Sequence, residues 1–523
     1  MPKTRRLLRR EITYASAKEE EHNILHQLSY YDKQNKFFAH LSAHQSWIKG
    51  VVAHHLNLSS PDACQVSKVE DWLHGSFNVC IPITASSRGA KPMVLRLPLP
   101  YRIGEDFMPG NGDEKVRCEA GTYAWLQENC PDVPIPELYG FGLSTGEAFT
   151  HAEKLPLLHR WIHAIRCRVL SWLGCQTPST YVPHHVKGEQ AIHSSYLLLE
   201  YILPSRGSML SNTWADRQHD VKLRTTFFRS ISRILLSISQ VPVPRIGSFV
   251  IDHRGYLVLA NRPLSIEIQQ LENEQIPTGI HRDYTYSTVD SYVSDVLSFH
   301  DNRFLFQPNA VNDLGDSVFQ LSSLSAMRTI SKSFFKRELG RGPFVLSLTD
   351  LHQSNIFVDD DWNVTCLLDL EWACSLPIEM IRPFHWLTNL GVDQLVPAEY
   401  DKVRTEFMDA LKIEEKALLT SNHDSPLLSD IMDRTWATGT FWYTLALSSP
   451  SGLFTIFQRH IRPLFCANNL EEFHLIMPFL WGRNVGRIAY QKVSDKEEYD
   501  RKLEQEFKDE DELQTSFPAD RSS

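Results

Sequence analysis

The spacing of apolar residues changes along the chain and divides it into a strand-like part and a helical part. Between residues 71 and 203, short apolar runs alternate with turn-forming residues, which is the pattern of strands and hairpins. Strands are predicted in WLHGSFNVCIPI, MVLRLPLP and SYLLLEYI. The segment 114–130 departs from this pattern and reads as a helix with Asp113 as its N-cap. From Leu210 onward helical patterns dominate, as in WATGTFWYTLAL.

One hairpin interrupts the helical part. In LTDLHQSNIFVDDDWNVTCLLDLEWA, which starts at Leu348, the apolar runs IFV and CLL flank DDDWN, a turn by composition. The acidic residues 359–361 are therefore predicted to form the turn and to face solvent. Strand interiors disfavour Asp and Asn. The placement of Asp350, Asn355 and Asp369 at the ends of the hairpin thus calls for a reason other than packing.

Five segments are distinguished by composition. Residues 1–60 predict an N-terminal helical extension that begins with a basic tail. The strand-rich part covers 61–203 and contains an insertion at 151–193 that is rich in His, Trp and Leu. The helical part covers 204–493. Residues 494–523 are highly charged, which predicts a solvated helix that frays into a disordered end.

The 523 residues suffice for more than one structural unit. The net charge of −10 gives no electrostatic case for a nucleic-acid partner. Nine cysteines without a CxxC pair favour a reduced intracellular protein. No apolar run reaches the ~18 residues of a membrane span. The start MPKTRRLLRR lacks an apolar signal core, so a cytoplasmic location is expected, with a mitochondrial one as the minority alternative.

The ends of the hairpin carry residue types that suit phosphoryl transfer. This reaction needs a carboxylate that accepts the proton of the attacking hydroxyl, and oxygen ligands that hold Mg²⁺ against the phosphates. Protein kinases place an Asp, four residues and an Asn on one loop, and a further Asp after a hairpin. Asp350 and Asn355 have this spacing, and Asp369 follows the second strand. Asp and Asn are also common turn formers, but the ordered set favours the functional interpretation.

The hairpin DLHQSNIFVDDDWNVTCLLDLEWA resembles the aminoglycoside phosphotransferase and choline-kinase-like superfamily, whose signature is H-G-D-x-x-x-x-N, a hairpin and I-D-W. The upstream segments VLRLPLP, EKVRCEAGTYAWLQENCPDVPIPELYGFG and LLLEYI resemble the fungal branch of that superfamily. The resemblance implies an α+β, two-lobed protein-kinase-like fold. Residues 61–203 would be a small, strand-rich, nucleotide-binding N-lobe, and 204–493 a mainly helical C-lobe that carries the catalytic loop and the metal site.

The resemblance also implies roles for the polar residues of the hairpin. Asp350 would be the catalytic base. Asn355 and Asp369 would hold Mg²⁺. Glu371 is left open between a metal group and a supporting one, and His352 is expected to pack within the loop.

The nucleotide would be bound by the N-lobe. Arg96 would occupy the position of the usual phosphate-binding lysine, and Glu119 on the following helix would pair with it. The remaining expected contacts are the turn over the phosphates and the backbone that receives adenine: Gly75, Ser76 and Asn78, and Glu200, Tyr201 and Ile202.

Two residues depart from the family pattern. Arg96 replaces a lysine, and this exchange is not conservative because guanidinium is planar and bidentate. Leu348-Thr349 replaces the usual His-Gly before the catalytic aspartate, and leucine cannot order the loop by hydrogen bonding. Both departures lower the expected turnover.

The resulting hypothesis is an enzyme that transfers the γ-phosphate of ATP, with Mg²⁺, to a hydroxyl of a small molecule. The first alternative is a pseudokinase that binds a nucleotide or a partner, because of Arg96 and Leu348-Thr349. The second is a protein kinase, which is disfavoured because no APE-type segment follows Asp369. The acceptor and the oligomeric state stay open.

Overall fold

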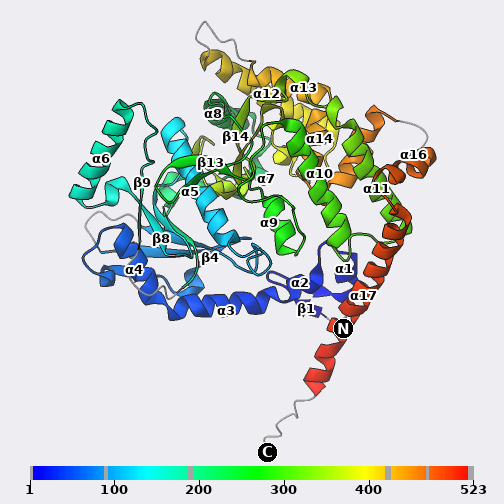
Figure 1. The fold of residues 1–523 in the computed structure, drawn as a ribbon, viewed down its shortest axis with the longest axis horizontal. Coiled ribbons are helices and arrows are strands. Elements are labelled where there is room, and N and C mark those ends of the chain that lie inside the picture. Colours follow the sequence, from blue (N-terminus) through cyan, green and yellow to red (C-terminus); the bar gives the residue numbers. More distant parts are fainter. Residues whose placement is uncertain (1–3, 87–91, 186–191, 419–425, 467–469, 516–523) are drawn as a thin grey trace, which may run out of the picture.

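A strand-rich part and a helical part share one long helix, α5 (Asn111–Asn129), in the computed structural model of the chain (Figure 1). The structure describes residues 4–86, 92–185, 192–418, 426–466 and 470–515. Among the described residues, eight strands lie between residues 64 and 200, and helices predominate after residue 203. The predicted α+β class, with a strand-rich N-lobe and a mainly helical C-lobe, is therefore confirmed.

The N-lobe is built on an antiparallel sheet whose described strands follow the order β3-β5-β6-β10-β7-β8-β9, with β4 paired to β5. Arg96 stands in the middle of this sheet, opposite Cys80 on one neighbour and Leu197 on the other. The strands are β3 (Cys64–Val66), β4 (Leu73–His74), β5 (Asn78–Ala85), β6 (Met93–Pro98), β7 (Leu138–Gly142), β8 (Glu147–His151), β9 (Tyr181–His185) and β10 (Tyr196–Glu200).

Both faces of the sheet are covered, which explains the continuous apolar run of β10. Successive side chains of a strand point to opposite faces. Leu198 therefore packs in the cluster formed with α3 (Tyr30–Ala43) and α4 (Gln45–His55), whereas Leu197 and Leu199 pack in the cluster that contains α5. The sheet is thus held between the N-terminal helices and α5.

The helix α5 begins three residues before the predicted start. Gly110 precedes it with φ 92°, a left-handed conformation that favours glycine. The carboxylate of Asp113, the predicted N-cap, instead accepts bonds from the backbone N–H and the hydroxyl of Ser144 at 2.8 and 2.7 Å. A Cβ at Gly121 would lie 2.1 Å from the carbonyl oxygen of Phe249, so glycine allows α5 to lie directly against β12.

The C-lobe surrounds three small sheets with helices. Its strands are β11 (Ser208–Met209), β12 (Ser248–Ile251), β13 (Leu257–Asn261), β14 (Phe344–Leu348), β15 (Ile356–Val358), β16 (Val364–Leu367) and β17 (Ala373–Pro377). Its helices are α7 (Trp214–Arg217), α8 (Val221–Ser239), α9 (Ile266–Asn273), α10 (Val289–Phe306), α11 (Leu314–Ile330), α12 (Pro397–Leu418), α13 (Leu428–Ala437), α14 (Thr440–Leu447), α15 (Leu453–Ile456) and α16 (Leu470–Ile476). The strands pair as β11-β15-β16, β12-β13 and β14-β17.

A helix near the C-terminus packs against the N-terminal segment, within the residues that the structure describes. The helix α17 (Val485–Thr515) runs through the predicted boundary at residue 493. Its buried Tyr499, Leu503 and Phe507 pack against the N-terminal segment, because a charged sequence can still carry an apolar stripe at helical spacing. This segment holds β1 (Thr4–Arg6), β2 (Glu11–Thr13), α1 (Tyr14–Glu19) and α2 (Ile24–Leu28). The end of the predicted tail, 516–523, lies outside the described residues.

The predicted insertion 151–193 consists of helix α6 (Leu157–Trp172) followed by the edge strand β9; its residues 186–191 lie outside the described part. In the part of the chain that the structure describes, no helix is long and apolar enough to cross a bilayer.

Candidate active site

Asp350 and Asn355 lie at the start of the β15–β16 hairpin. Asp350 stands in the turn after β14, and Asn355 ends the short 3₁₀ turn Gln353–Asn355 that leads into β15. The Nδ2 of Asn355 donates to the carbonyl oxygen of Asp350 at 2.9 Å and lies 3.4 Å from its Oδ2. The two predicted site residues are therefore held together by the loop itself.

Asp369 follows β16 at the other end of the hairpin. The N–H of Leu368 donates to the carbonyl oxygen of Asn355 at 2.8 Å, so closing the hairpin brings its two ends together. The backbone of Asp369 has φ 55° and ψ 63°, a left-handed conformation that is unfavourable by roughly 1–2 kcal/mol for a residue with a Cβ. Such strained residues cluster at functional sites.

Arg96 is surrounded by three carboxylates. Its Nη1 lies 2.7 Å from Oε1 of Glu119, and its Nη2 lies 2.7 Å from both Oδ1 of Asp369 and Oε2 of Glu371. The side chain of Arg96 is 5% exposed, and that of Glu119 is fully buried. The expected partnership of Arg96 with Glu119 is thus present in the structure, and Asp369 and Glu371 join it from the C-lobe.

Glu371 connects the two lobes through one oxygen. Its Oε2 accepts hydrogen bonds from Arg96, from Nδ2 of Asn78 at 2.7 Å and from the ammonium of Lys115. Lys115 also donates to Oδ1 of Asn78 at 2.7 Å and lies 5.3 Å from the ring centroid of Trp372. Glu371 and Lys115 are both buried, so this network is internal to the protein.

Lys115 is the member of the site that sequence reasoning missed. It lies one helical turn before Glu119 on α5, so the two side chains share one face of that helix. This i, i+4 spacing was the available signal. It is common on exposed helices, and the sequence alone does not show that this face is buried.

The environment separates the acidities of the carboxyl groups. Burial, with the charges of Glu371, Asp369 and Glu267, raises the pKa of Asp350 to about 7. Burial likewise raises the pKa of Glu119 to about 7, against the effect of Arg96. Burial also acts to raise the pKa of Glu371. The positive charges of Arg96 and Lys115 outweigh this effect and hold the pKa of Glu371 below its usual value. Asp350 is therefore poised to exchange a proton near neutral pH.

The turn expected over the phosphates lies between β4 and β5. Gly75 and Ser76 are exposed there, and the N–H of Gly75 donates to the carbonyl oxygen of Asn78 at 3.0 Å. Asn78 is the first residue of β5, and its buried side chain is engaged by Lys115 and Glu371; its role over the phosphates stays a prediction.

The segment expected to receive adenine ends β10. Glu200 is the last residue of the strand, three residues after Leu197, the partner of Arg96, so it lies about 10 Å along the sheet from Arg96. Its carboxylate pairs with Arg206 at 3.1 Å. The N–H of Tyr201 donates to the carbonyl oxygen of Pro92 at 3.0 Å. Ile202 follows and is half-buried.

The loop around Asp350 is held by hydrogen bonds from Thr349 and Trp386. The hydroxyl of Thr349 donates to the carbonyl oxygen of Trp372 at 2.5 Å. The indole of Trp386 donates to the carbonyl oxygen of Leu351 at 2.9 Å. The ring of His352 caps its own turn by accepting from the N–H of Ser354, in agreement with a packing role. Thr349 thus supplies a hydrogen bond that Leu348 cannot make.

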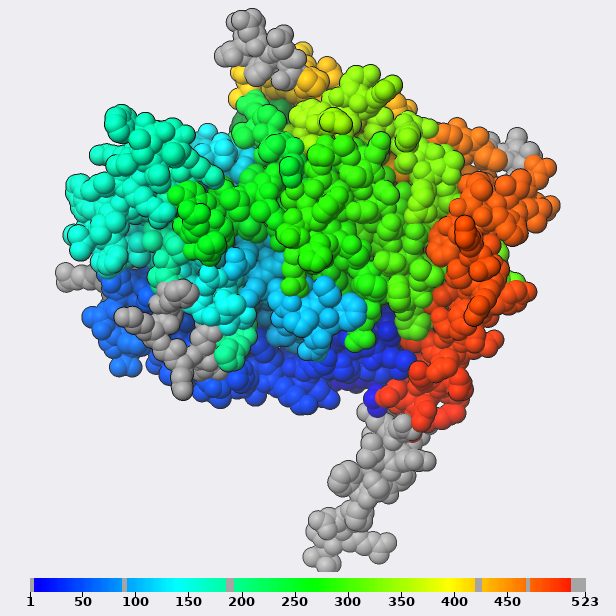
Figure 2. Space-filling model, in the orientation of Figure 1, coloured from blue at the N-terminus to red at the C-terminus, as the bar shows by residue number. Residues whose placement is uncertain are grey.

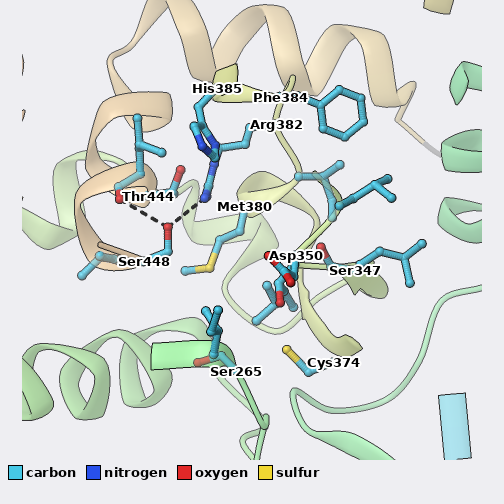
Figure 3. A pocket seen from close by; sticks show the side chains of 18 of the residues that line it. Ser265, Ser347, Asp350, Cys374, Met380, Arg382, Phe384, His385, Thr444 and Ser448 are labelled. Carbon is cyan, nitrogen blue, oxygen red and sulfur yellow. Dashed lines mark hydrogen bonds between the residues drawn. The ribbon is translucent and has the colours of Figure 1, made fainter. Parts of the chain in front are cut away.

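A cavity of about 250 Å³ opens beside Asp350 in the C-lobe (Figure 3). Most of its wall is apolar and includes Met380 and Phe384. The polar groups on its wall include Glu267 and Arg382, whose Nη2 donates to the hydroxyl of Ser448 at 2.7 Å. A small molecule in this cavity would have Asp350 at its boundary.

The hairpin offers hard oxygen ligands of the kind that Mg²⁺ prefers. Among the described residues, no cluster of three or more His, Cys, Asp or Glu side chains could hold a metal ion by itself. Mg²⁺, however, is commonly bound by one or two protein groups together with substrate phosphates and water. The side chain of Asp369, 41% exposed, and the amide oxygen of Asn355 fit that use.

Two solved structures show a distant overall similarity to the chain. No protein-family model and no curated protein sequence matches the chain. Among solved structures, a candidate aminoglycoside phosphotransferase from Ralstonia eutropha shares 11% identity at a TM-score of 0.41, covering 88% of this chain and 98% of its own. A macrolide 2′-phosphotransferase type I shares 15% identity at a TM-score of 0.34, covering 80% and 97%. At such TM-scores we draw no functional conclusion from the likeness.

Proposed function

We propose that the protein is a phosphotransferase that moves the γ-phosphate of ATP to a hydroxyl of a small molecule. The observation that carries this proposal is the hairpin, which holds Asp350 and Asn355 at one end and Asp369 at the other. A base, two oxygen ligands for a metal and a buried guanidinium then lie around one point. These are the parts that phosphoryl transfer requires.

Asp350 is the proposed base. Its pKa of about 7 allows it to accept the proton of an acceptor hydroxyl near neutral pH. As the hydroxyl oxygen bonds to the γ-phosphorus, the bond from that phosphorus to the bridging β-phosphate oxygen breaks and ADP leaves. Asp350 keeps the proton until it passes to solvent.

The other residues position the donor. Bound ATP·Mg²⁺ supplies the phosphoryl group and neutralises its charge. Asn355 and Asp369 are the proposed Mg²⁺ ligands, and Arg96 the proposed phosphate contact. Glu119 and Glu371 hold the guanidinium of Arg96 in place. Gly75, Ser76 and Asn78 and the backbone of Glu200, Tyr201 and Ile202 stay predictions as nucleotide contacts.

The cavity beside Asp350 is the proposed acceptor site. Its volume of about 250 Å³ suits a small molecule rather than a folded protein segment. The largely apolar wall favours a hydroxylated molecule with an apolar body. A polycationic sugar would lose hydration there without enough carboxylates to replace it.

One observation favours the pseudokinase alternative. The carboxylates of Asp369 and Glu371 already pair with the guanidinium of Arg96. A nucleotide phosphate would have to compete with them for that guanidinium. In that case the chain would bind a nucleotide or a partner without turnover.

The proposal is tested by phosphoryl transfer from labelled ATP to a library of small hydroxylated metabolites, with Mg²⁺ and the full chain. Asp350→Asn should lower the rate by about 10²–10⁴-fold, the usual contribution of base catalysis. Asp360→Asn in the exposed hairpin turn is the matched control and should leave the rate unchanged. Binding of ATP·Mg²⁺ without transfer to any acceptor would favour the pseudokinase, and transfer only to proteins would favour the protein kinase.

A further inference from the structure

The helix α6 (Leu157–Trp172) presents an uncovered apolar face to solvent. None of its 16 residues is buried. Eight large apolar side chains on α6 and the residue after it are between 48% and 85% exposed: Leu157, Leu158, Trp161, Ile162, Ile165, Val169, Trp172 and Leu173. The helix projects from the edge of the molecule (Figures 1 and 2). Soluble proteins rarely leave so large a contiguous apolar patch open to water.

The apolar side chains of α6 share one side of the helix. At 100° per residue they fall within an arc of about 160°. The opposite side faces the protein, where Cys167 approaches the carbonyl oxygen of Pro178. The attachment is slight, and it includes a bond from Arg166 to the hydroxyl of Tyr256 at 3.3 Å. A helix of this length without a covered apolar face is only marginally stable in water, so a binding partner is expected.

The charge of the helix indicates the kind of partner. Residues 157–173 contain Arg160, Arg166 and Arg168 and no Asp or Glu, although the whole chain carries a net charge of −10. All three arginines are exposed. On the helical wheel Arg168 and Arg166 lie near the two borders of the apolar arc. The partner should therefore combine an apolar interior with a negatively charged surface.

The width of the apolar face distinguishes a bilayer from a protein helix. A coiled-coil partner needs only a narrow seam of two positions per heptad, whereas the arc here is about 160°. Trp161 and Trp172 lie about 20° apart within this arc, and tryptophan is a residue that concentrates at membrane–water interfaces. A basic helix with a broad Leu, Ile and Trp face is typical of helices that lie in the plane of a membrane surface.

We propose that α6 is an interfacial anchor that binds the surface of anionic lipid bilayers. Its 16 residues give a length of about 24 Å, which is shorter than the ~30 Å hydrocarbon core, so the helix lies along the surface. The apolar side chains enter the headgroup boundary, and the arginines contact the anionic headgroups. This binding is independent of the proposed phosphoryl transfer and concerns a different face of the protein.

Vesicle co-flotation of the full chain tests the anchor. Phosphatidylcholine vesicles with phosphatidylserine should bind the protein, and added salt should weaken the binding. Ile165→Glu should reduce binding at least about tenfold, since it buries a charge in the headgroup boundary. Ile413→Glu is the matched control, because Ile413 on α12 is 55% exposed and Ile165 is 56% exposed; it should bind like the unchanged protein.

The arginines are tested separately. Arg160→Gln with Arg168→Gln should weaken binding to phosphatidylserine vesicles by about fivefold for each charge and leave the weak binding to pure phosphatidylcholine unchanged. Absence of binding to both kinds of vesicle would overturn the proposal. So would a dimer in solution that Ile165→Glu converts to a monomer without any vesicle binding, because the face would then be a contact between copies of the chain.

Discussion

Arg96 donates to Asp369 across the boundary between the lobes, with 2.7 Å between Nη2 and Oδ1. The proposed phosphate contact and the proposed metal ligand thus form an ion pair with each other. In the proposed function, ATP·Mg²⁺ would exchange this ion pair for two others, Asp369 with the metal and Arg96 with a phosphate. The exchange makes both residues sensitive reporters of nucleotide binding.

The first prediction concerns that exchange. ATP with Mg²⁺ should raise the melting temperature, because a ligand near 100 times its dissociation constant adds about 2.7 kcal/mol to the stability of the folded state. Asp369→Ala should reduce the shift strongly, since it removes a metal ligand. Differential scanning fluorimetry measures the shift in melting temperature, and Asp360→Ala in the exposed turn is the control. Equal shifts in the two variants would contradict a metal role for Asp369.

Arg96→Lys should lower phosphoryl transfer and should not rescue it. Lysine keeps the charge but cannot reach Glu119 on one side and Glu371 on the other as the planar guanidinium does. A hydrogen bond to a charged group contributes about 1.5–3 kcal/mol, so losing one would slow transfer about tenfold or more. Arg117→Lys is the control, because Arg117 also lies on the N-lobe and pairs with Glu147 at 2.8 Å. A gain of activity in Arg96→Lys would identify Arg96 as a degraded site.

Glu371→Gln should destabilise the protein. The substitution leaves two buried cations, Arg96 and Lys115, without their shared carboxylate, and breaking a buried ion pair typically costs about 3–5 kcal/mol. Urea unfolding measures the change. Glu399→Gln at an exposed position of α12 should have little effect. Similar stability of both variants would mean that the network contributes little to holding the lobes together.

The site residues that lie close together in the sequence were predictable, because they belong to one continuous segment. Asp350, Asn355 and Asp369 belong to one hairpin, and strand propensity places them at its ends without any knowledge of the rest of the fold. The division into lobes follows from the change in apolar spacing for the same reason. The pairing of Arg96 with Glu119 was expected from the family resemblance, not from local pattern.

The parts that were missed depend on contacts between distant residues. Lys115 and Glu371 are 256 positions apart, and neither local sequence reveals that their side chains meet. The amide of Asn78 bonds to both of these residues, a contact that its own sequence segment does not reveal either. In the same way, the stripe of α17 that packs on the N-terminal segment was hidden within a highly charged sequence.

The last prediction concerns pH. Burial raises the pKa of Asp350 from 3.8 to about 7, so the folded protein keeps this proton up to neutral pH while the unfolded chain loses it near pH 4. The folded state therefore binds more protons between these values, and its stability falls as pH rises through that window. Asparagine is neutral at every pH. Asp350→Asn should match the unchanged protein below about pH 4 and be more stable above about pH 7.

The same group should control activity in the opposite direction. Only ionised Asp350 can accept a proton, so kcat/KM of the unchanged protein should rise with pH and level off above about 7, the pKa of the free enzyme's base. Unfolding curves and initial rates measured across this pH range test both trends on one sample set. Asp360→Asn should follow the unchanged protein in both measurements, because Asp360 lies in the exposed turn. A rate that falls as pH rises from 6 to 8, roughly the span in which Asp350 ionises, would exclude Asp350 as the base even if Asp350→Asn were inactive.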